Sequence, residues 1–227
     1  MAEIRQSGRY DATRLPEGQF EPGSHGRVLK NLLGIKRKRE IDEVEAREQL
    51  RALRQLIGIY DEAHVFTAGD IQKIHRTWLG PIYPWAGEYR QVNVTKDGFP
   101  FAAAREIPKL MGELEQGPLR KFTPCRFDSD DQVVEALAVL HTELMLIHPF
   151  REGNGRTGRL LAILMGLQAK LPPLDFRSIK GKTRQEYFAA VRAGMGARYE
   201  PMKRIFNDVV RRTRRAALRA GFGRDMR

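Results

Sequence analysis

Apolar residues recur at helical spacing along most of this 227-residue chain, and the pattern predicts a mainly helical protein. From Glu40 onward, charged residues separate apolar ones at the spacing of an amphipathic helix, namely Ile41, Val44, Leu50, Leu53 and Ile57. Thr67 followed by Asp70 resembles a capping box, which predicts the start of a second helix. Further helices are predicted over residues 107–114, 132–147, 157–169, 183–193 and 201–220.

One segment follows a different pattern. Between Tyr89 and Phe101, β-forming residues flank the pair Asp97-Gly98, which is a hairpin signal. We therefore predict an all-α protein, a bundle of about seven to nine helices, with one small β-hairpin. Residues 1–27 contain much Gly and Pro, which predicts an extended or partly disordered leader, and residues 208–227 form a basic helix or tail.

The composition indicates a globular protein with affinity for anions. Hydrophobic residues make up 41% of the chain, and no apolar run is long enough to span a bilayer. The net charge of +12 favours nucleotides, nucleic acid or acidic protein surfaces as partners. Cys125 is the only cysteine, which excludes an intramolecular disulfide and favours a reducing compartment such as a cytosol.

The candidate chemistry lies in the twelve residues from His148 to Arg159, HPFREGNGRTGR, between two apolar helices. Gly153 and Gly155 permit φ > 0 and a close approach of a ligand to the backbone. The N–H groups at the start of the next helix face this turn and favour phosphate binding. Arg156 and Arg159 lie three residues apart, so both guanidiniums could reach adjacent phosphates.

Other side chains of this window add a metal ligand, a base and an anchor. Glu152 is a hard oxygen ligand, and Mg²⁺ typically takes one or two carboxylates together with substrate phosphates. Asn154 could hydrogen-bond to a phosphate oxygen, and a neutral His148 could accept a proton from an incoming hydroxyl. Phe150 is expected to point into the core and hold the loop. We interpret His141 as a packing residue.

The window resembles the signature of the Fic family, HPFx[D/E]GNGRxxR, at every specified position. The resemblance extends more loosely over residues 28–207 as a Fic domain. It includes Pro84–Arg90 and the hairpin after it, which looks like the family's flap. The resemblance implies the Fic fold and a protein adenylyltransferase, which transfers AMP from ATP to a Ser, Thr or Tyr hydroxyl of a target protein and releases pyrophosphate.

The resemblance also implies a role for each residue of the motif. His148 would be the general base, Glu152 would hold Mg²⁺, and Asn154, with the backbone at Gly153 and Gly155, would seat the α-phosphate. Arg156 would neutralise the β-phosphate and Arg159 would meet the γ-phosphate. The flap would pair with an extended target segment as an added strand through Val92, Asn93, Val94, Thr95 and Lys96.

Many family members are restrained by a helix bearing [S/T]xxxE[G/N], and Thr13–Gly18 fits this string. Because Pro16 and a Gly-rich context disfavour such a helix, we expect any restraint to come from a small antitoxin-like protein in trans.

Two alternatives stay open on the sequence alone. The same fold could transfer UMP, GMP, phosphocholine or a bare phosphate, although the Doc-type kinases of the family carry lysine where this chain has Gly155. A non-catalytic nucleic-acid-binding module would explain the basic charge but not the clustered acid, base and phosphate turn. We expect ATP and a hydroxyl-bearing protein as partners, no nucleic acid, and a bacterial cytoplasmic toxin or effector whose export stays open.

Overall fold

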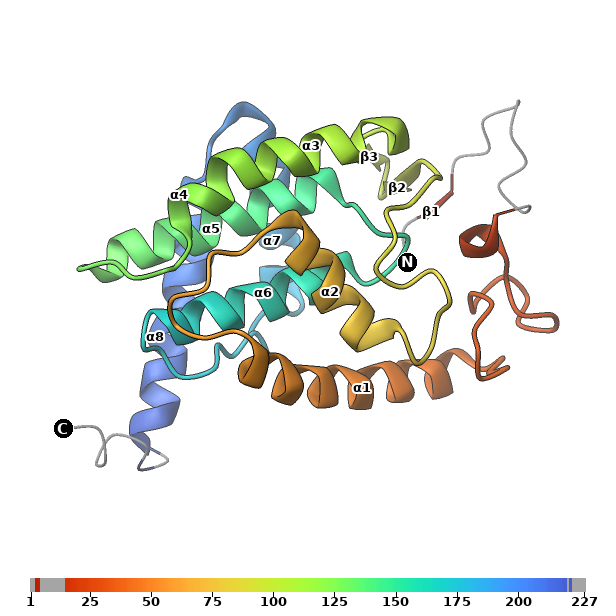
Figure 1. The fold of residues 1–227 in the computed structure, drawn as a ribbon, viewed down its shortest axis with the longest axis horizontal. Coiled ribbons are helices and arrows are strands. Elements are labelled where there is room, and N and C mark those ends of the chain that lie inside the picture. Colours follow the sequence, from red (N-terminus) through yellow and green to blue (C-terminus); the bar gives the residue numbers. More distant parts are fainter. Residues whose placement is uncertain (1–2, 5–14, 220, 222–227) are drawn as a thin grey trace. The chain divides into compact units, whose positions relative to one another are not determined.

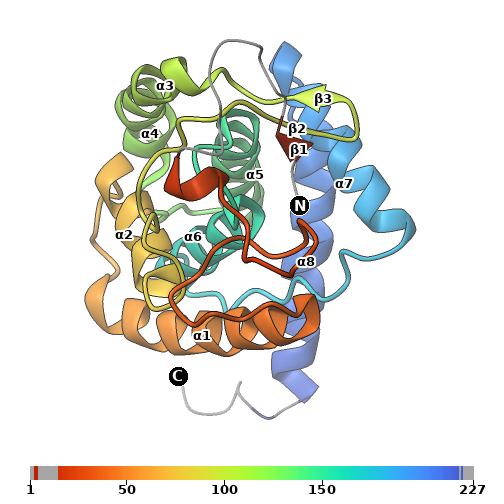
Figure 2. The same cartoon turned by 90° about the vertical axis from the view of Figure 1, so that its right-hand side faces the viewer.

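The computed structural model describes residues 3–4, 15–219 and 221, and the chain divides into two compact units. Unit 1 comprises residues 1–59, 67–113 and 147–157, and unit 2 comprises residues 60–66, 114–146 and 158–227. Among the described residues, seven α-helices have eight residues or more, which confirms the predicted mainly helical fold (Figures 1 and 2). None of the described helices is long and apolar enough to cross a membrane.

Unit 1 is built around α1 (Lys38–Ile59) and α2 (Ala68–Leu79), which pack against each other. The predicted capping box is present, since the Thr67 side chain accepts a hydrogen bond from the Asp70 N–H, and the Asp70 carboxylate accepts one from the Thr67 N–H. The buried positions of α1 are Ile41, Glu45, Ala52 and Leu56.

The apolar stripe predicted for α1 is wrong at two positions. Leu50 is 61% exposed and Ile57 is 43% exposed. Residues at positions 41, 45, 52 and 56 follow one another at spacings of four and seven, so they share one helix face, and Leu50 and Ile57 fall outside it. The buried face of α1 therefore contains a carboxylate, Glu45, where the sequence pattern suggested only apolar residues.

The flap of unit 1 is an antiparallel sheet in the order β1 (Glu3–Ile4), β2 (Val94–Lys96) and β3 (Phe99–Pro100). The hairpin between β2 and β3 confirms the prediction, and its turn residues Asp97 and Gly98 both have positive φ, 49° and 74°. Two positive φ values in succession match the twist of the strands. The strands are shorter than the predicted hairpin, and the sequence pattern did not predict β1.

A short 3₁₀ turn (Ala104–Glu106) leads into α3 (Ile107–Leu114), whose bounds agree with the predicted ones. The chain then continues through a π-helical turn (Glu115–Leu119) into α4 (Arg120–Phe122). The predicted elements did not include these two segments.

Unit 2 consists mainly of α5 (Asp130–Ile147), most of α6 (Asn154–Gln168), α7 (Lys182–Ala193) and α8 (Glu200–Arg219). Its core is aliphatic and aromatic, with fully buried side chains such as Leu137, Leu144, Leu161, Met202 and Phe206. Helix α7 packs on α8, and Tyr199 donates a hydrogen bond of 2.6 Å to Glu143 of α5. The boundary between the units falls inside α6, after Thr157.

Part of the predicted leader lies outside the described residues, namely residues 1–2 and 5–14. From residue 15 to 27, the chain contains a 3₁₀ turn (Pro16–Gly18) and an isolated bridge between Phe20 and Leu29. Glu17 and Ser24 are buried. These residues are therefore packed into unit 1. At the other end, residues 208–219 lie on α8, and the division into a leader, a domain over residues 28–207 and a tail stays a prediction.

Candidate active site

Residues 148–153 form the loop between α5 and α6, and contacts within unit 1 fix its first residue. His148 has a left-handed backbone with φ of 53°. Its ring stacks on Phe101, just after the flap, with a centroid distance of 3.7 Å and an interplanar angle of 12°. Its carbonyl accepts a hydrogen bond of 2.8 Å from the Arg90 Nε. The imidazole is therefore half-buried and held on both its ring and its backbone.

Arg90 ties the flap to this loop. Its guanidinium donates to the carbonyls of Val92 at 2.7 Å, Ala102 at 2.6 Å and Ile147 at 3.3 Å, and its backbone N–H donates to Pro149. Burial lowers the pKa of Arg90 to about 10, so the guanidinium stays protonated at neutral pH. One buried cation thus connects both ends of the hairpin with the backbone of His148.

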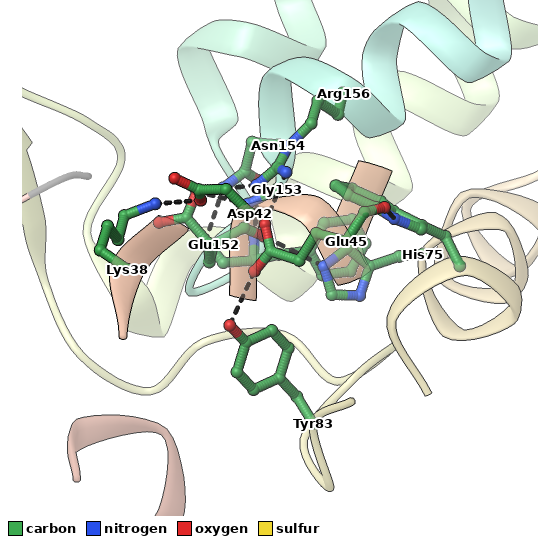
Figure 3. A network of polar contacts seen from close by, with 11 residues as sticks. Lys38, Asp42, Glu45, His75, Tyr83, Glu152, Gly153, Asn154 and Arg156 are labelled. Atoms are coloured by element: carbon green, nitrogen blue, oxygen red, sulfur yellow. Dashed lines mark hydrogen bonds and ion pairs between the residues drawn. The ribbon is translucent and has the colours of Figure 1, made fainter. Parts of the chain in front are cut away.

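His75 of α2 fixes the centre of the loop (Figure 3). Its Nδ1 accepts from the Gly87 N–H at 2.8 Å, and its Nε2 is 3.0 Å from the Glu152 carbonyl. Burial lowers the pKa of His75 to about 3, so the ring is neutral and its proton sits on Nε2, facing that carbonyl. Phe150 is fully buried and stacks on this ring at 3.9 Å.

The start of α6 differs from the prediction. The Gly153 carbonyl accepts the N–H of Arg156 at 3.0 Å and of Thr157 at 2.9 Å, so the helix begins at Asn154 rather than at Thr157. Gly153 has φ of 82°, and a Cβ there would lie 2.8 Å from the Trp78 ring. Gly155 lies within the first turn of α6. The N–H groups of Asn154 and Gly155 therefore belong to the helix N-terminus, which favours an anion.

The Asn154 side chain is engaged with the loop itself. Its Oδ1 accepts from the Phe150 N–H at 2.8 Å, and its Nδ2 donates to the Phe150 carbonyl at 2.7 Å. Asn154 is 2% exposed. The sequence assigned this amide to a phosphate oxygen, whereas in the structure it closes the turn that presents the backbone N–H groups.

Glu152 is the acidic residue of the loop. Its Oε1 accepts from the Gly153 N–H at 3.0 Å and lies 3.6 Å from the Arg156 Nη2. Its Oε2 is buried and has no hydrogen-bond partner within the part of the chain that the structure describes. Such a carboxylate oxygen fits a hard cation like Mg²⁺. The described residues contain no cluster of three acidic, His or Cys side chains that could hold a metal.

Arg156 is held by residues far away in the sequence. Its Nη1 lies 2.5 Å from Oε2 of Glu45 on α1, and its guanidinium lies 4.5 Å above the Trp78 ring. Tyr83 donates a hydrogen bond of 2.7 Å to Oε1 of Glu45. Figure 3 shows Glu45, Tyr83 and Arg156 beside the loop. Side chains of α1 and α2 thus hold the arginine nearest the helix N-terminus.

Arg159 lies three residues further along α6, in unit 2. His141 and Tyr187 are close to it and hydrogen-bond to each other at 2.8 Å. Burial, with the charge of Arg159 as a smaller cause, lowers the pKa of His141 to about 3. His141 is therefore a neutral, buried packing residue, as interpreted from the sequence.

The flap residues predicted to bind a target lie at the base and on the first strand of the hairpin. Val92, Val94 and Thr95 are buried. The Asn93 side chain accepts from the Ala104 N–H at 2.8 Å. On the outer edge of β2, Thr95 pairs with Glu3 of the same chain. The edge of β2 therefore can accept an antiparallel strand.

Glu17, in the string that resembles an inhibitory motif, contacts the base of the flap. Its Oε1 accepts the N–H groups of Gln91 at 2.6 Å and Val92 at 3.2 Å, and its carbonyl accepts from Arg151 Nε at 3.1 Å. Burial raises the pKa of Glu17. Thr13, which begins the string, lies outside the described residues. Within unit 1, Glu17 connects the flap with the loop.

Comparison with known proteins decides the family. The sequence profile of the Fic/DOC family matches residues 65–165. A protein of Sinorhizobium fredii named as the probable protein adenylyltransferase y4lH is 31% identical over 155 residues, which are 66% of this chain and 73% of y4lH. The chain belongs to the Fic/DOC family.

Two other similar proteins extend the comparison. The protein adenylyltransferase VbhT of Bartonella schoenbuchensis is 32% identical over 152 residues, which are 66% of this chain. This Fic protein spans only 30% of the length of VbhT. The crystal structure of BepC from Bartonella tribocorum with bound AMPPNP has a TM-score of 0.64 and 25% identity, covering 80% of this chain and 91% of BepC.

Four residues that hold the Fic motif in place were not found from the sequence, namely Glu45, His75, Tyr83 and Arg90. Of these four residues, Glu45 lies on the buried face of α1, which the predicted apolar stripe did not place correctly. Since Lys and Glu are almost never fully buried unless paired, a carboxylate on such a face indicates a cationic partner.

Proposed function

We propose that this Fic protein transfers AMP from ATP to a Ser, Thr or Tyr hydroxyl of a target protein and releases pyrophosphate. The observation that carries the proposal is the loop of unit 1, where His148 is held before the loop, and Glu152 and Arg156 contact each other at the N-terminus of α6. The names of VbhT and y4lH and the AMPPNP in BepC support ATP as the nucleotide and AMP as the transferred group.

The proposed reaction is an in-line displacement at the α-phosphorus. The neutral imidazole of His148 accepts the proton of the target hydroxyl, and the hydroxyl oxygen forms a bond to the α-phosphorus. The bond from the α-phosphorus to the oxygen that bridges to the β-phosphate breaks, and pyrophosphate leaves with that electron pair. Positioning and charge stabilisation supply most of the rate enhancement.

Each residue around the triphosphate has one proposed contact. The N–H groups of Asn154 and Gly155 and the dipole of α6 hold the α-phosphate. Arg156 neutralises the β-phosphate as it becomes part of the leaving group, and Arg159 meets the γ-phosphate. Asn154 acts through its side chain as a positioning residue, because its amide closes the loop onto Phe150.

Glu152 is the proposed protein ligand of Mg²⁺, through the buried Oε2 that has no other partner in the described part of the chain. When bound, Mg²⁺ would neutralise negative charge on the phosphates. The bonds of Oε1 to the Gly153 N–H and of the Glu152 carbonyl to His75 hold this carboxylate at the helix N-terminus.

The flap is the proposed docking site for the target. An extended target segment would add to the outer edge of β2, using the main-chain groups of Val92 to Lys96. The pairing of Glu3–Ile4 with β2 supports this, because it demonstrates a register for an antiparallel strand at that edge. A docked target would take the place of this segment.

Restraint by a small protein in trans is proposed for the same site. The carboxylate of Glu17 is engaged by flap backbone, which supports a structural role for Glu17. Purified enzyme with the candidate inhibitor should label itself more slowly than enzyme alone, and equal rates would contradict the proposal.

BepC is described as a VirB-translocated effector, and we propose the bacterial cytoplasm for this chain, with export as the alternative.

Mass spectrometry of modified proteins tests the proposed function. Lysate proteins are incubated with Mg²⁺, ATP and either the wild type or His148→Ala. AMP adducts on Ser, Thr or Tyr that require the wild-type enzyme would support the proposal. Adducts of another nucleotide or of phosphate alone, or adducts that appear equally with both enzymes, would contradict it.

A further inference from the structure

Within the Fic motif, only Glu152 has a contact with the Arg156 guanidinium among the described residues, and that contact is long, at 3.6 Å. A free arginine side chain has four rotatable bonds, and ordering it on a ligand costs conformational entropy. In this structure Glu45, Trp78 and Glu152 already surround the guanidinium. The strongest of these contacts comes from Glu45 of α1, which is 111 residues away in the sequence.

Glu45 differs from three other acids of α1. The carboxylates of Asp42, Glu43 and Glu48 pair with Lys38, Arg39 and Arg51 of the same helix, at partly exposed positions. The side chain of Glu45 is 4% exposed, and its ion pair reaches out of α1 to the start of α6. Figure 3 shows this difference, with Lys38 and Asp42 paired along α1 and Glu45 facing Arg156.

Both oxygens of Glu45 are engaged, and only one partner is charged. Oε1 accepts a hydrogen bond from the Tyr83 hydroxyl. Burial is the main cause that raises the pKa of this phenol, and the charge of Glu45 raises it further, so Tyr83 is a neutral donor. Oε2 contacts Nη1 of Arg156. A buried carboxylate requires a matched cation. Arg156 supplies this charge, and the pair fixes one edge of the guanidinium.

The backbone of Glu45 also fixes Trp78, whose ring lies against the Arg156 guanidinium. The Glu45 carbonyl accepts a hydrogen bond of 2.9 Å from the Trp78 Nε1. The Trp78 ring in turn supports the Arg156 guanidinium and closely approaches Gly153. One residue of α1 therefore sets both the plane and the direction of the arginine.

We propose that Glu45 is a positioning residue for the transfer reaction and acts through Arg156 on the leaving pyrophosphate. This inference rests on the proposed function. With Nη1 held by Glu45, Nη2 lies 3.6 Å from Oε1 of Glu152, the residue proposed to hold Mg²⁺ beside the phosphates. Donors that are aligned in advance need no reorganisation when charge develops in the transition state.

The test compares Glu45→Gln with Glu43→Gln, the same substitution at an exposed site of the same helix. Glutamine keeps the size of Glu45 and can still accept from Tyr83, but it cannot match the arginine charge. We expect kcat of Glu45→Gln to fall by about 10- to 100-fold while KM for ATP changes less than about threefold. Glu43→Gln should behave like the wild type, since its ion pair is exposed.

A double substitution separates positioning from a general loss of structure. If Glu45 acts through Arg156, Glu45→Gln should cause no further loss of kcat in an Arg156→Gln background. Multiplied losses, or a wild-type kcat in Glu45→Gln, would overturn the inference. Thermal unfolding of all variants and calorimetric titration with AMPPNP and Mg²⁺ verify folding and nucleotide binding. If the wild type itself labels no protein, the proposed function fails instead, and the inference fails with it.

Discussion

Arg156 and Arg159 have different surroundings, although they lie three residues apart on one helix. Arg156 is matched by the buried carboxylate of Glu45 at 2.5 Å. Arg159 lies near the neutral pair of His141 and Tyr187, and its charge contributes to the low pKa of His141. The two arginines should therefore respond differently to the phosphates of a nucleotide.

Replacing Arg159 by Ala should weaken the hold on the γ-phosphate only. We expect KM for ATP to rise by about tenfold, in line with the loss of one charge-assisted contact, and KM for ADP as donor to change less than about threefold. Steady-state labelling with each donor measures this, with Arg215→Ala on the exposed face of α8 as the matched control. An equal rise for both donors would reject the assignment.

The residues proposed to contact the nucleotide lie within one short window of the sequence, so the sequence alone could group them. His148, Glu152 and Arg156 stand within one window, so no tertiary information was needed to group them. Glu45 could not be assigned in this way, because a charged residue on α1 is usually a solvated one. Only the tertiary fold brings it to Arg156.

At the scale of elements, the flap and the loop of the Fic motif behave as one piece of structure because Arg90 joins them. Arg90 is 1% exposed and donates to carbonyls of Val92, Ala102, Ile147 and His148. Hydrogen bonds from a charged group are stronger than neutral ones, and their buried acceptors cannot turn to water.

Arg90→Lys should therefore destabilise the protein although it keeps the charge. A lysine ammonium cannot reproduce the planar fork, so several buried carbonyls lose their donor. We expect the free energy of unfolding to fall by about 3 kcal/mol in urea denaturation. The same substitution at Arg105, which is 88% exposed, should change it by less than about 0.5 kcal/mol. Similar values for both variants would contradict the role of Arg90.

The elements were predicted best where one local signal decided them. The pair Asp97-Gly98 predicted the hairpin turn, and Thr67 with Asp70 predicted the start of α2. The start of α6 was placed too late, because it depends on hydrogen bonds between Asn154 and the backbone of Phe150. Strand β1 depends on pairing with a segment about 90 residues away, which no local pattern reveals.

At the scale of the whole molecule, two buried neutral histidines make stability depend on pH. Burial lowers the pKa of His75 and of His141 to about 3, against an ordinary value of about 6.5. Below about pH 6.5 the unfolded chain binds a proton that the folded chain does not. The contribution of these two histidines to the free energy of unfolding is fully present above about pH 6.5 and is lost as pH falls towards 3.

His141→Gln should make the protein less sensitive to acid. Between pH 6.5 and 4.5, the free energy of unfolding of the wild type should fall more steeply than that of the variant, by roughly 1.4 kcal/mol per pH unit. Urea denaturation at several pH values measures both slopes. His25→Gln, which removes an exposed imidazole, is the matched control. Identical slopes for the wild type and His141→Gln would contradict the buried neutral state of His141.

The composition predicted the class of partner for the whole chain but not where the charge acts. A net charge of +12 favoured anions in general. The structure shows that part of the basic tail is paired within unit 2, for example Arg214 with Asp130 of α5. The phosphate site is instead proposed for the helix N-terminus in unit 1, which the Gly-rich turn after His148 indicated and the net charge did not.

Labelling with ATP that carries its radioactive atom at either the α- or the γ-phosphate tests the central claim most directly. With Mg²⁺ and a target-containing lysate, we predict that protein acquires label from the α-phosphate only. His148→Ala should lose this labelling while it binds AMPPNP as tightly as the wild type does. Protein labelled from the γ-phosphate, or undiminished labelling by His148→Ala, would contradict the account.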